Sequence, residues 1–463
     1  MEINTAIVAG TGKSGISATK LLVNHGVKVY LFDENKDRDI EAIKEKTGDS
    51  ELVQIELGEL GEDALSSSQL MVISPGIPVD APFTDVVRNA GIPIWSEIEL
   101  AYHYGKGKIA AITGTNGKTT TTALVGEIVK AHNAKTIVVG NIGIPYTELC
   151  DTTDDDSDTV AEISSFQLET VIDFHPNVSA ILNLTPDHLN RHYTFENYGN
   201  VKFSITKNQT MDDVTVLNYD DEHTRAMGEK AKEHCHVVYF SRLEKPAGGV
   251  YLEDGDIILE DGDKKINVLA IKDLKLMGAH NVENVLAAVG ISYYMGVPVD
   301  VIRDVATSFK AVAHRIEYVD TVDGVAYYND SKGTNPDAAI KGIQAMVAPT
   351  FLIGGGYDKG SEYDEWIEAF DGKVKWLVLI GQTAQKIADC AKRHGFNSII
   401  FEENLQDAVA YCHENAVDGD AVLLSPACAS WGQFDNYEQR GDMFKEYVKI
   451  GRASCRERVY VLV

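Results

Sequence analysis

Residues Thr113-Gly114-Thr115-Asn116-Gly117-Lys118-Thr119-Thr120 form a glycine-rich loop around which the rest of the chain can be interpreted. An apolar run over residues 108–112 precedes the loop and predicts a buried strand, and apolar residues at helical spacing follow it over residues 123–129. Strand, glycine loop and helix together are typical of a phosphate-binding loop, in which backbone N–H groups and the helix N-terminus face phosphate oxygens. Ile112 occupies the position of the usual first glycine, so the loop is a variant of the Walker pattern.

The residue types in this loop suit a nucleoside triphosphate. We expect Lys118 to reach the β- and γ-phosphates and the Thr119 hydroxyl to ligate Mg²⁺. The rest of the loop supplies the other expected ATP contacts, which are Gly114, Thr115, Asn116, Gly117 and Thr120. The alternative is a plain turn between strand and helix, but a Gly-Lys-Thr-Thr sequence at the junction favours the phosphate loop.

Length, charge and cysteine content restrict the class of protein. A chain of 463 residues predicts about three domains. The 70 acidic and 42 basic residues give a net charge of −28, which argues against a nucleic-acid or anionic-membrane partner. Six scattered cysteines without a Cys-x-x-Cys pair, no apparent signal peptide and no membrane-spanning apolar run predict a cytoplasmic protein with reduced thiols and no structural zinc.

The first region, about residues 1–95, contains a second glycine loop. A predicted strand over residues 5–9 leads into Gly10-Thr11-Gly12-Lys13-Ser14-Gly15, and after a helix the next strand ends at Asp33. This pattern is typical of dinucleotide binding, with the acidic residue near a ribose hydroxyl. An NAD site, another nucleotide-linked ligand and an empty structural turn all remain open. A loop at Ser74-Pro75-Gly76 follows the strand over residues 69–73, and it is either a ligand loop or a simple turn.

In the central region, about residues 96–302, three polar side chains come at or just after predicted strand ends. They are Asn141, Glu162 and His188. Because the carboxyl ends of parallel strands share one edge of a sheet, we expect these groups to lie near the phosphate loop, where Glu162 can ligate Mg²⁺ and His188 can join a second metal site. Helix caps or surface groups are the alternative for each.

Other features of the central region carry weaker signals. Lys202 lies on a helical stretch over residues 195–207, and composition gives no reason to separate it from a solvated lysine. Asn284 lies on a helix that begins near residue 279, where it can cap the helix or bind a base. Residues 214–270 look rich in β-strands, with Asp-Gly hairpin signals at Asp254 and Asp261.

The third region, about residues 303–449, alternates strands and helices and predicts another doubly wound α/β domain. Asp330 and Lys332 follow the strand over residues 325–328 in a short polar loop that suits anions and metals, although a helix cap is the alternative. Helical periodicity stops near Lys449. Residues 450–463 read like the translation of a sequencing adapter, so we expect a non-native tail there.

Several separated motifs together resemble the Mur ligases, the ATP-dependent amino-acid-adding enzymes of peptidoglycan synthesis. The matching segments are TGTNGKTT at 113–120, EISSFQLE at 162–169, LNLTPDHL at 182–189, HR at 314–315, NDSK at 329–332 and SPACAS at 425–430. The segments SSFQLE and YEQRG (437–441) are similar to the D-glutamate-adding branch of the family. The match extends over about residues 5–445.

The resemblance implies a three-domain α/β fold and a reaction. An N-terminal Rossmann-like domain (1–95) would bind the UDP substrate, a central P-loop domain (96–302) would bind ATP, and a C-terminal domain (303–449) would bind ATP and D-glutamate. The enzyme would join D-glutamate to UDP-N-acetylmuramoyl-L-alanine through an acyl phosphate and a tetrahedral intermediate, with ATP converted to ADP and phosphate. We expect it to be a monomer, with no membrane insertion.

The resemblance also implies roles for individual residues. The expected catalytic residues are Lys118, His188, Lys202 and Arg315. The expected ATP ligands outside the loop are Asn284, Arg315, Asp330 and Lys332. The expected UDP-substrate ligands are Gly12, Ser14, Asp33, Ser74, Gly76, Asn141, Gln167 and His188, and those for D-glutamate are Lys359, Ser430 and Tyr437. Two Mg²⁺ sites would use Thr119, Glu162, His188 and Lys202, with Lys202 carbamylated so that its ammonium becomes a carboxylate-like ligand.

Three rival interpretations differ in class. A folylpolyglutamate synthetase would share the phosphate loop but would lack the first 95 residues as a UDP-binding domain. An NAD-dependent dehydrogenase would use Gly10 to Gly15 and would leave Lys118 unexplained. A non-enzymatic nucleotide-binding module would bind ATP without turnover and would give His188 no function.

Overall fold

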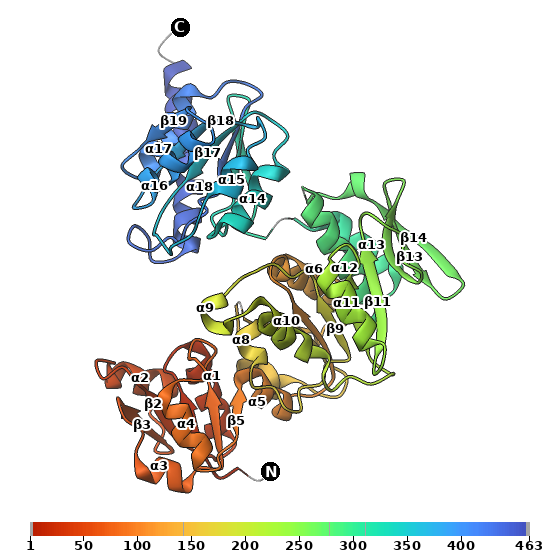
Figure 1. Ribbon diagram of the computed structural model, residues 1–463, viewed down its shortest axis with the longest axis vertical. Coiled ribbons are helices and arrows are strands. Elements are labelled where there is room, and N and C mark those ends of the chain that lie inside the picture. Colours follow the sequence, from red (N-terminus) through yellow and green to blue (C-terminus); the bar gives the residue numbers. More distant parts are fainter. Residues whose placement is uncertain (1–2, 142, 277, 311, 460–463) are drawn as a thin grey trace. The chain divides into compact units, whose positions relative to one another are not determined.

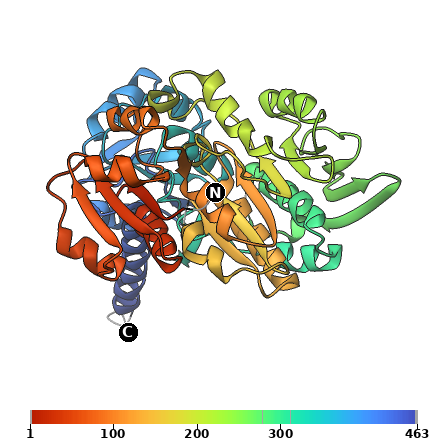
Figure 2. The ribbon, with the colours of Figure 1, turned by 90° about the horizontal axis from the view of Figure 1, so that it is seen from below.

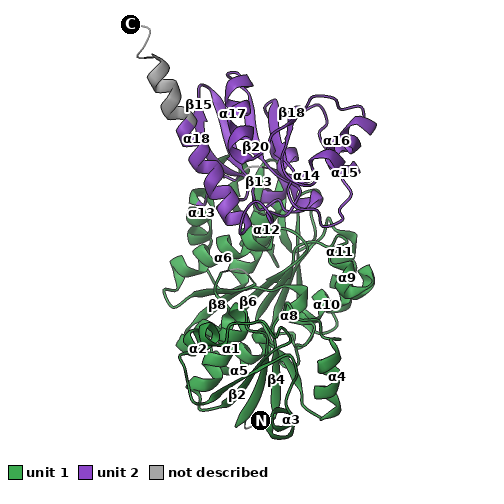
Figure 3. Cartoon of the chain, turned by 90° about the vertical axis from the view of Figure 1, so that its left-hand side faces the viewer, with its two compact units in different colours: residues 1–274, 283–308 green, residues 275–282, 309–463 purple. Residues whose placement is uncertain are grey.

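The computed structural model describes residues 3–141, 143–276, 278–310 and 312–459, with side chains described up to residue 450. The chain forms two compact units, one of residues 1–274 and 283–308 and the other of residues 275–282 and 309–463 (Figure 3). The first unit contains two sheets and the second contains one (Figure 1). Helices separate most of the parallel strands, so the predicted α/β class is confirmed, with one sheet for each of the three predicted domains.

The N-terminal sheet has five parallel strands in the order β3-β2-β1-β4-β5, with helices along it (Figure 2). The strands are β1 (Thr5–Ala9), β2 (Lys28–Asp33), β3 (Val53–Leu57), β4 (Leu70–Ile73) and β5 (Ile94–Ser96), and the helices are α1 (Lys13–Asn24), α2 (Ile40–Thr47), α3 (Glu62–Ser67) and α4 (Pro82–Asn89). The strand order reverses between β1 and β4. The loops at Gly10 and Ser74 therefore flank the switch point, where open α/β sheets bind ligands.

The central sheet has nine strands in the order β14-β13-β12-β11-β10-β9-β6-β8-β7. Its parallel part comprises β6 (Lys108–Thr113), β7 (Ile137–Gly140), β8 (Asp158–Glu162), β9 (Val178–Ile181), β10 (Val214–Asn218), β11 (His236–Ser241) and β12 (Gly249–Glu253). The antiparallel hairpins to β13 (Asp256–Asp261) and β14 (Lys264–Ala270) confirm the turns predicted at Asp254 and Asp261. The β-rich interpretation of residues 214–270 was incomplete, because helix α11 (Glu222–Ala231) lies between β10 and β11.

Helices connect these central strands. They are α5 (Glu97–Tyr104), α6 (Lys118–His132), α7 (Tyr146–Leu149), α8 (Ser165–Leu168), α9 (Leu189–His192), α10 (Phe195–Phe203), α12 (Ala279–Tyr294) and α13 (Val299–Ser308), with short 3₁₀ turns at 150–152, 204–206 and 271–273. Among the helices of the described residues, none combines the length and apolar character needed to cross a membrane.

The sheet of the second unit has the order β15-β16-β20-β17-β18-β19, and it is parallel except for the β15–β16 pair. Its strands are β15 (Glu317–Val322), β16 (Val325–Asn329), β17 (Thr350–Gly354), β18 (Val374–Leu379), β19 (Ile399–Phe401) and β20 (Ala421–Leu424). The helices are α14 (Pro336–Ala345), α15 (Asp364–Glu368), α16 (Ala384–Arg393), α17 (Leu405–Asn415) and α18 (Tyr437–Val459). Helix α18 passes the end predicted near Lys449 by ten residues, so that predicted boundary was wrong.

Close contact between α1 and the end of β1 fixes the first glycine loop. Gly10 has φ +103°, and a Cβ atom on Gly15 would lie 1.8 Å from the carbonyl oxygen of Gly10. A Cβ atom on Gly12 would meet nothing within 4 Å. The third glycine of the motif is therefore required for packing of the helix against the strand.

We predict that Gly15→Ala destabilises the first unit by about 1–3 kcal/mol, because backbone atoms must shift to make room for the methyl group. Urea unfolding measures this change. Gly12→Ala is the matched control at the N-cap of the same helix, where a Cβ atom meets nothing within 4 Å, and it should unfold within about 0.5 kcal/mol of the unchanged protein. Equal midpoints for the two variants would contradict the packing argument.

Candidate active site

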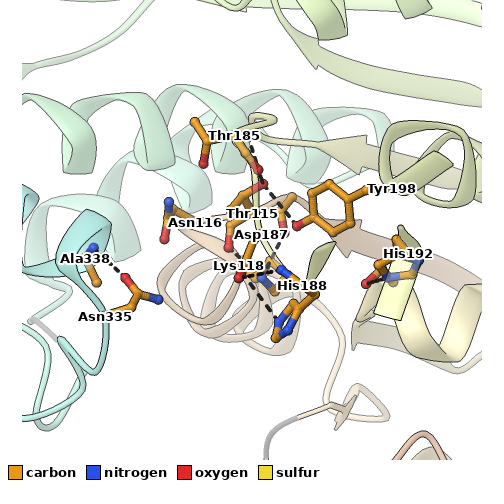
Figure 4. A network of polar contacts seen from close by, with 12 residues as sticks. Thr115, Asn116, Lys118, Thr185, Asp187, His188, His192, Tyr198, Asn335 and Ala338 are labelled. Atoms are coloured by element: carbon orange, nitrogen blue, oxygen red, sulfur yellow. Dashed lines mark hydrogen bonds and ion pairs between the residues drawn. The ribbon is translucent and has the colours of Figure 1, made fainter. Parts of the chain in front are cut away.

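The phosphate loop connects β6 to α6 and is held by hydrogen bonds to the segment after β9. Gly114 and Gly117 have positive φ values of +147° and +85°. The backbone N–H of Thr115 donates to the Asn183 carbonyl oxygen (3.0 Å), and the Asn116 N–H donates to the Asn183 side chain (2.8 Å). The Thr115 hydroxyl lies 3.1 Å from the Tyr198 hydroxyl (Figure 4). The loop therefore has a fixed shape whose glycines permit the turn.

Two lysines converge on this loop. Lys118 begins α6, and its Nζ donates to the carbonyl oxygens of Gly114 and Thr115, each at 2.8 Å. Lys202, on α10, is only 1% exposed, and its Nζ donates to the Gly114 carbonyl oxygen at 2.9 Å and to the Thr113 hydroxyl at 3.2 Å. Composition alone did not separate Lys202 from a solvated lysine, yet the structure buries it at the base of the loop.

Burial is the main cause that lowers the pKa of Lys202 well below its ordinary value. The positive charge of Lys118 lowers the pKa further, whereas Asp187 and Glu162 act in the opposite direction. A buried amine with a lowered pKa has a larger neutral fraction, and a neutral amine is a nucleophile.

Asn141, Glu162 and His188 come at or after the carboxyl ends of β7, β8 and β9, which are parallel strands of one sheet, as expected. Glu162 is the last residue of β8 and is 2% exposed, and its Oε1 accepts a hydrogen bond from the Asn141 side chain at 3.0 Å. His188 lies seven residues beyond the end of β9, with φ +52° and its ring 4.8 Å from that of Phe166. On the other side of the loop, a Cβ atom on Gly117 would lie 2.3 Å from Oδ1 of Asn284, which is on α12.

At the N-terminal switch point, Asp33 supports the first glycine loop. Its carboxylate accepts hydrogen bonds from the Thr11 hydroxyl (2.6 Å), the Thr11 N–H (3.1 Å) and the Asn35 N–H (3.0 Å). Burial acts to raise the pKa of Asp33, but these bonds and the charge of Arg38 hold that pKa below its ordinary value. Ser74 Oγ is buried without a hydrogen-bond partner, next to Gly10. Gly12 and Ser14 lie at the start of α1, and Gly76 is exposed in the second loop.

Two buried carboxylates near this region were not among the residues singled out from the sequence. Glu97 is 1% exposed and accepts hydrogen bonds from the Thr147 N–H (2.7 Å) and from the Gln167 side chain (3.4 Å). Thr147 in turn contacts Ser17 on α1 at 2.9 Å. Glu99 accepts three backbone N–H bonds, from residues 172, 173 and 174. No motif in the sequence marks these two glutamates, because their partners lie about 50 to 75 residues further along the chain.

Glu97 also affects a predicted substrate ligand. Gln167 is 2% exposed, and its Oε1 accepts a hydrogen bond from the Ser164 N–H at 2.9 Å while its Nε2 donates to Glu97. Both ends of the Gln167 side chain are therefore engaged inside the protein. It completes the capping box at the start of α8.

In the second unit, a buried aspartate anchors the loop after β16. Asp330 is 4% exposed, accepts a hydrogen bond from the Ser425 hydroxyl at 2.7 Å, and accepts one from the Ile316 N–H at 3.3 Å. Burial raises the pKa of Asp330 to about 7, against the opposing effects of Ser425 and the Arg315 charge. Arg315 belongs to a turn in which His314 and Ile316 both have positive φ, and its Nε is buried without a hydrogen-bond partner.

The remaining predicted residues of this unit surround Tyr437 and Trp431. Lys332 Nζ lies 5.2 Å from the Tyr437 ring centre, and Lys359 Nζ lies 5.0 Å from that of Trp431. Ser430 is 4% exposed at the start of the segment leading to Trp431. Arg440 lies in the YEQRG segment and was given no role from the sequence. It is 1% exposed, donates to the Ser331 hydroxyl (2.9 Å) and carbonyl oxygen (2.7 Å), and therefore fixes the Asp330 loop.

Comparison with known proteins assigns the whole chain. The MurD-like N-terminal domain of Mur ligases matches residues 4–96, the Mur ligase middle domain matches residues 112–292, and the Mur ligase glutamate ligase domain matches residues 314–428. The UDP-N-acetylmuramoylalanine–D-glutamate ligase of Lachnospira eligens is 56% identical over 97% of this chain and 99% of its own length. The protein of that name from Clostridioides difficile is 47% identical over 96% and 97% of the two chains.

Solved structures agree with the fold. The crystal structure of the UDP-N-acetylmuramate–alanine ligase from Thermotoga maritima covers 97% of this chain and 100% of its own, with a TM-score of 0.60 at 19% identity. A pseudomurein peptide ligase from Methanothermus fervidus gives a TM-score of 0.58 over 96% and 99% of the two chains, at 17% identity. The chain therefore belongs to the Mur ligase family, and within that family to the relatives of the UDP-N-acetylmuramoylalanine–D-glutamate ligases.

Proposed function

We propose that this protein joins D-glutamate to UDP-N-acetylmuramoyl-L-alanine with conversion of ATP to ADP and phosphate, in cytoplasmic peptidoglycan precursor synthesis. The observation that carries the proposal is 56% identity with a ligase of that name along 97% of the chain. The phosphate loop of the first unit and the polar loops of the second support it chemically. We also propose that the enzyme acts as a monomer.

The first unit would hold the triphosphate of ATP. The fixed loop offers backbone N–H groups at the start of α6, and the glycine at 117 leaves room beside Asn284 that a side chain would fill. Lys118 would exchange its bonds to loop carbonyl oxygens for phosphate oxygens. Thr119 and Glu162 are suitable Mg²⁺ ligands, and the ion would neutralise charge on the transferred phosphoryl group.

Lys202 and His188 would form the second metal site. The neutral Nζ of Lys202 would attack CO₂, forming an N–C bond and releasing one proton, so that the lysine gains a carboxylate. Its burial and lowered pKa support this reaction because the free base is required. Hydrogen bonds to Thr113 and Gly114 orient Nζ at the base of the phosphate loop.

The N-terminal switch point would hold the UDP portion of the substrate. Ser74 Oγ is a buried polar atom that a diphosphate or ribose could satisfy, and Gly12 and Ser14 add the start of α1. Asp33 is rigidly held and can accept hydrogen bonds from the nucleoside, while Gly76 and Asn141 complete the ligand set. Gln167 would contact substrate only by exchanging one of its internal bonds.

The second unit would supply the remaining groups. Arg315, Asp330 and Lys332 would contact the nucleotide, and Lys359, Ser430 and Tyr437 would bind D-glutamate. The buried, unpartnered Arg315 Nε supports an anionic ligand at this turn. Because every reacting group is anionic, charge neutralisation by Lys118, Arg315 and the Mg²⁺ ions that the protein holds would be the main contribution to catalysis.

The test of the activity is phosphate release from Mg·ATP in the presence of both substrates. We expect release to require UDP-N-acetylmuramoyl-L-alanine and D-glutamate together and to fail with L-glutamate. Release supported by a folate acceptor, or no release by folded protein under any combination, would contradict the proposal.

We predict that Lys202→Ala reduces turnover at least about 10²-fold, because a metal ligand is lost. Short carboxylic acids added to the variant should restore part of the activity by replacing the carbamate. Lys207→Ala, at an exposed position further along the same segment, should retain full turnover. Full activity of the unrescued Lys202→Ala protein would exclude the carbamate role, and loss without any rescue would indicate a structural role.

From the raised pKa of Asp330 we predict how the free energy of unfolding depends on pH. Because burial raises this pKa to about 7, the folded protein binds a proton more tightly than the unfolded chain, whose aspartate titrates near 4. The free energy of unfolding should therefore fall as pH rises between about 4 and 7, by up to about 1.4 kcal/mol per pH unit from this group. Asp330→Asn should remove this part of the pH dependence. The Tm of the variant minus the Tm of the unchanged protein should therefore increase as pH rises from about 4 to 7. A Tm difference independent of pH would contradict the assignment.

A further inference from the structure

A second cluster of metal-binding side chains lies in the second unit, on helices α15 and α16. Asp364 is the first residue of α15, Cys390 lies in the last turn of α16, and His394 is the C-cap residue of α16. Their ligand atoms all lie within 4.8 Å of one another. The spacing of four residues puts Cys390 and His394 on one face of the helix, toward Asp364.

We propose that Asp364, Cys390 and His394 bind one Zn²⁺ ion, with water completing a tetrahedral site. A thiolate, an imidazole nitrogen and a carboxylate oxygen are the usual zinc ligands in proteins. The sulfur ligand favours Zn²⁺ over Mg²⁺ or Ca²⁺, which prefer oxygen alone. Because the sequence has no Cys-x-x-Cys pair, we expected no structural zinc. The proposed site instead uses one cysteine and one histidine of α16 together with Asp364 of α15.

Hydrogen bonding around His394 supports this assignment. Its Nε2 lies 2.8 Å from Asp364 Oδ1, and its Nδ1 lies 3.6 Å from Glu368 Oε1. A carboxylate behind the ring nitrogen that does not bind the metal is a common feature of zinc sites, because it fixes the tautomer and orientation of the imidazole. Glu368 can take that role because it lies one helical turn after Asp364, on the same short helix.

Zinc binding must displace a proton and a neighbouring cation. The Cys390 thiol is 3% exposed, and burial raises its pKa to about 11, so it is protonated at neutral pH. On coordination the S–H bond breaks, a Zn–S bond forms, and one proton leaves to water. Arg393 lies 3.4 Å from Asp364, but its side chain is 61% exposed and can turn away.

Another triad of this kind, in the first unit, lacks these properties. Glu99, His103 and Asp173 also have ligand atoms within 4.8 Å of one another. However, the carboxylate oxygens of Glu99 already accept three backbone N–H bonds, and the triad has no sulfur ligand. The two clusters can therefore be distinguished by spectroscopy, because only one can place a thiolate on the metal.

Zinc binding would link the N-terminal end of α15 to the C-terminal end of α16. These helices already pack through the apolar core that contains Trp366, Ile387 and Ala391. The segment from Gly355 to Tyr363 leads directly into α15 and carries Lys359. A metal at Asp364 would hold the C-terminal end of this segment in place, and it should raise the Tm of the protein.

The test is titration of the full, metal-free, reduced protein with Co²⁺ alone, followed by Zn²⁺. We expect one equivalent of Co²⁺ to produce the intense near-ultraviolet absorption of a thiolate–cobalt bond, and Zn²⁺ to abolish it by displacement. Cys390→Ser should lose this absorption. Cys412→Ser, on α17, is the matched control for a buried thiol of the same unit outside the cluster and should retain it.

Three surface variants keep the test independent of whether Cys390→Ser folds. His394→Asn and Asp364→Asn should each weaken Zn²⁺ binding by more than about tenfold, and Glu368→Gln by about tenfold, as measured by competition with a chromophoric chelator. Thiolate–cobalt absorption that persists in Cys390→Ser, or that disappears in Cys412→Ser, would overturn the proposal. Unchanged affinity in both His394→Asn and Asp364→Asn would overturn it as well.

Discussion

The hydrogen bonds between the phosphate loop and Asn183 are the constraint on which the central site depends. Asn183 accepts from the Thr115 N–H through its carbonyl oxygen and from the Asn116 N–H through its side chain, and its Nδ2 donates to the Asn116 carbonyl oxygen at 3.1 Å. These bonds join the loop after β6 to the segment after the adjacent strand β9. The protein's own hydrogen bonds therefore hold the shape of the loop, which lowers the free energy that a bound nucleotide would have to supply to order it.

The shape of the phosphate loop also determines where Lys118 and Lys202 lie. A carbonyl oxygen at Gly114 accepts from both Lys118 and Lys202, so the shape of the loop fixes two amines that differ greatly in exposure. The first is half-buried and can exchange its partners for phosphate oxygens. The second is buried and close to Tyr198, with its Nζ 4.8 Å from the ring centre. The same loop therefore positions one half-buried amine and one fully buried amine whose charged form is disfavoured.

Local sequence signals predicted much of the fold and of the site. The glycine loops at 10–15 and 113–120, the apolar strands before them and the Asp-Gly hairpins are all encoded by neighbouring residues. Helix α11 was missed because its sequence is polar and only three of its ten residues are buried. The end of α18 was also placed too early, since periodicity does not limit a helix that lacks a stop signal.

Residues whose environment depends on distant partners could not be predicted. Glu97 contacts Thr147, 50 residues away, and Gln167, 70 residues away. Lys202 was selected through family resemblance alone, since its partners at Thr113 and Gly114 are about 90 residues earlier in the chain. Arg440 likewise reaches Ser331 across 109 residues. Such contacts are set by the order of strands in the sheets, which periodicity and spacing do not encode.

The two units share one electrostatic feature at their predicted sites. Burial disfavours the charged form of Lys202 in the first unit and of Asp330 in the second, in opposite directions of pKa. Under the proposed function, Lys202 would exchange its suppressed positive charge for the negative charge of a metal-binding carbamate, and Asp330 would ionise more readily beside a bound cation. The free energy cost of a buried charge at either position would then be offset by the bound ligand, so ligand affinity and the stability of the folded protein would be coupled.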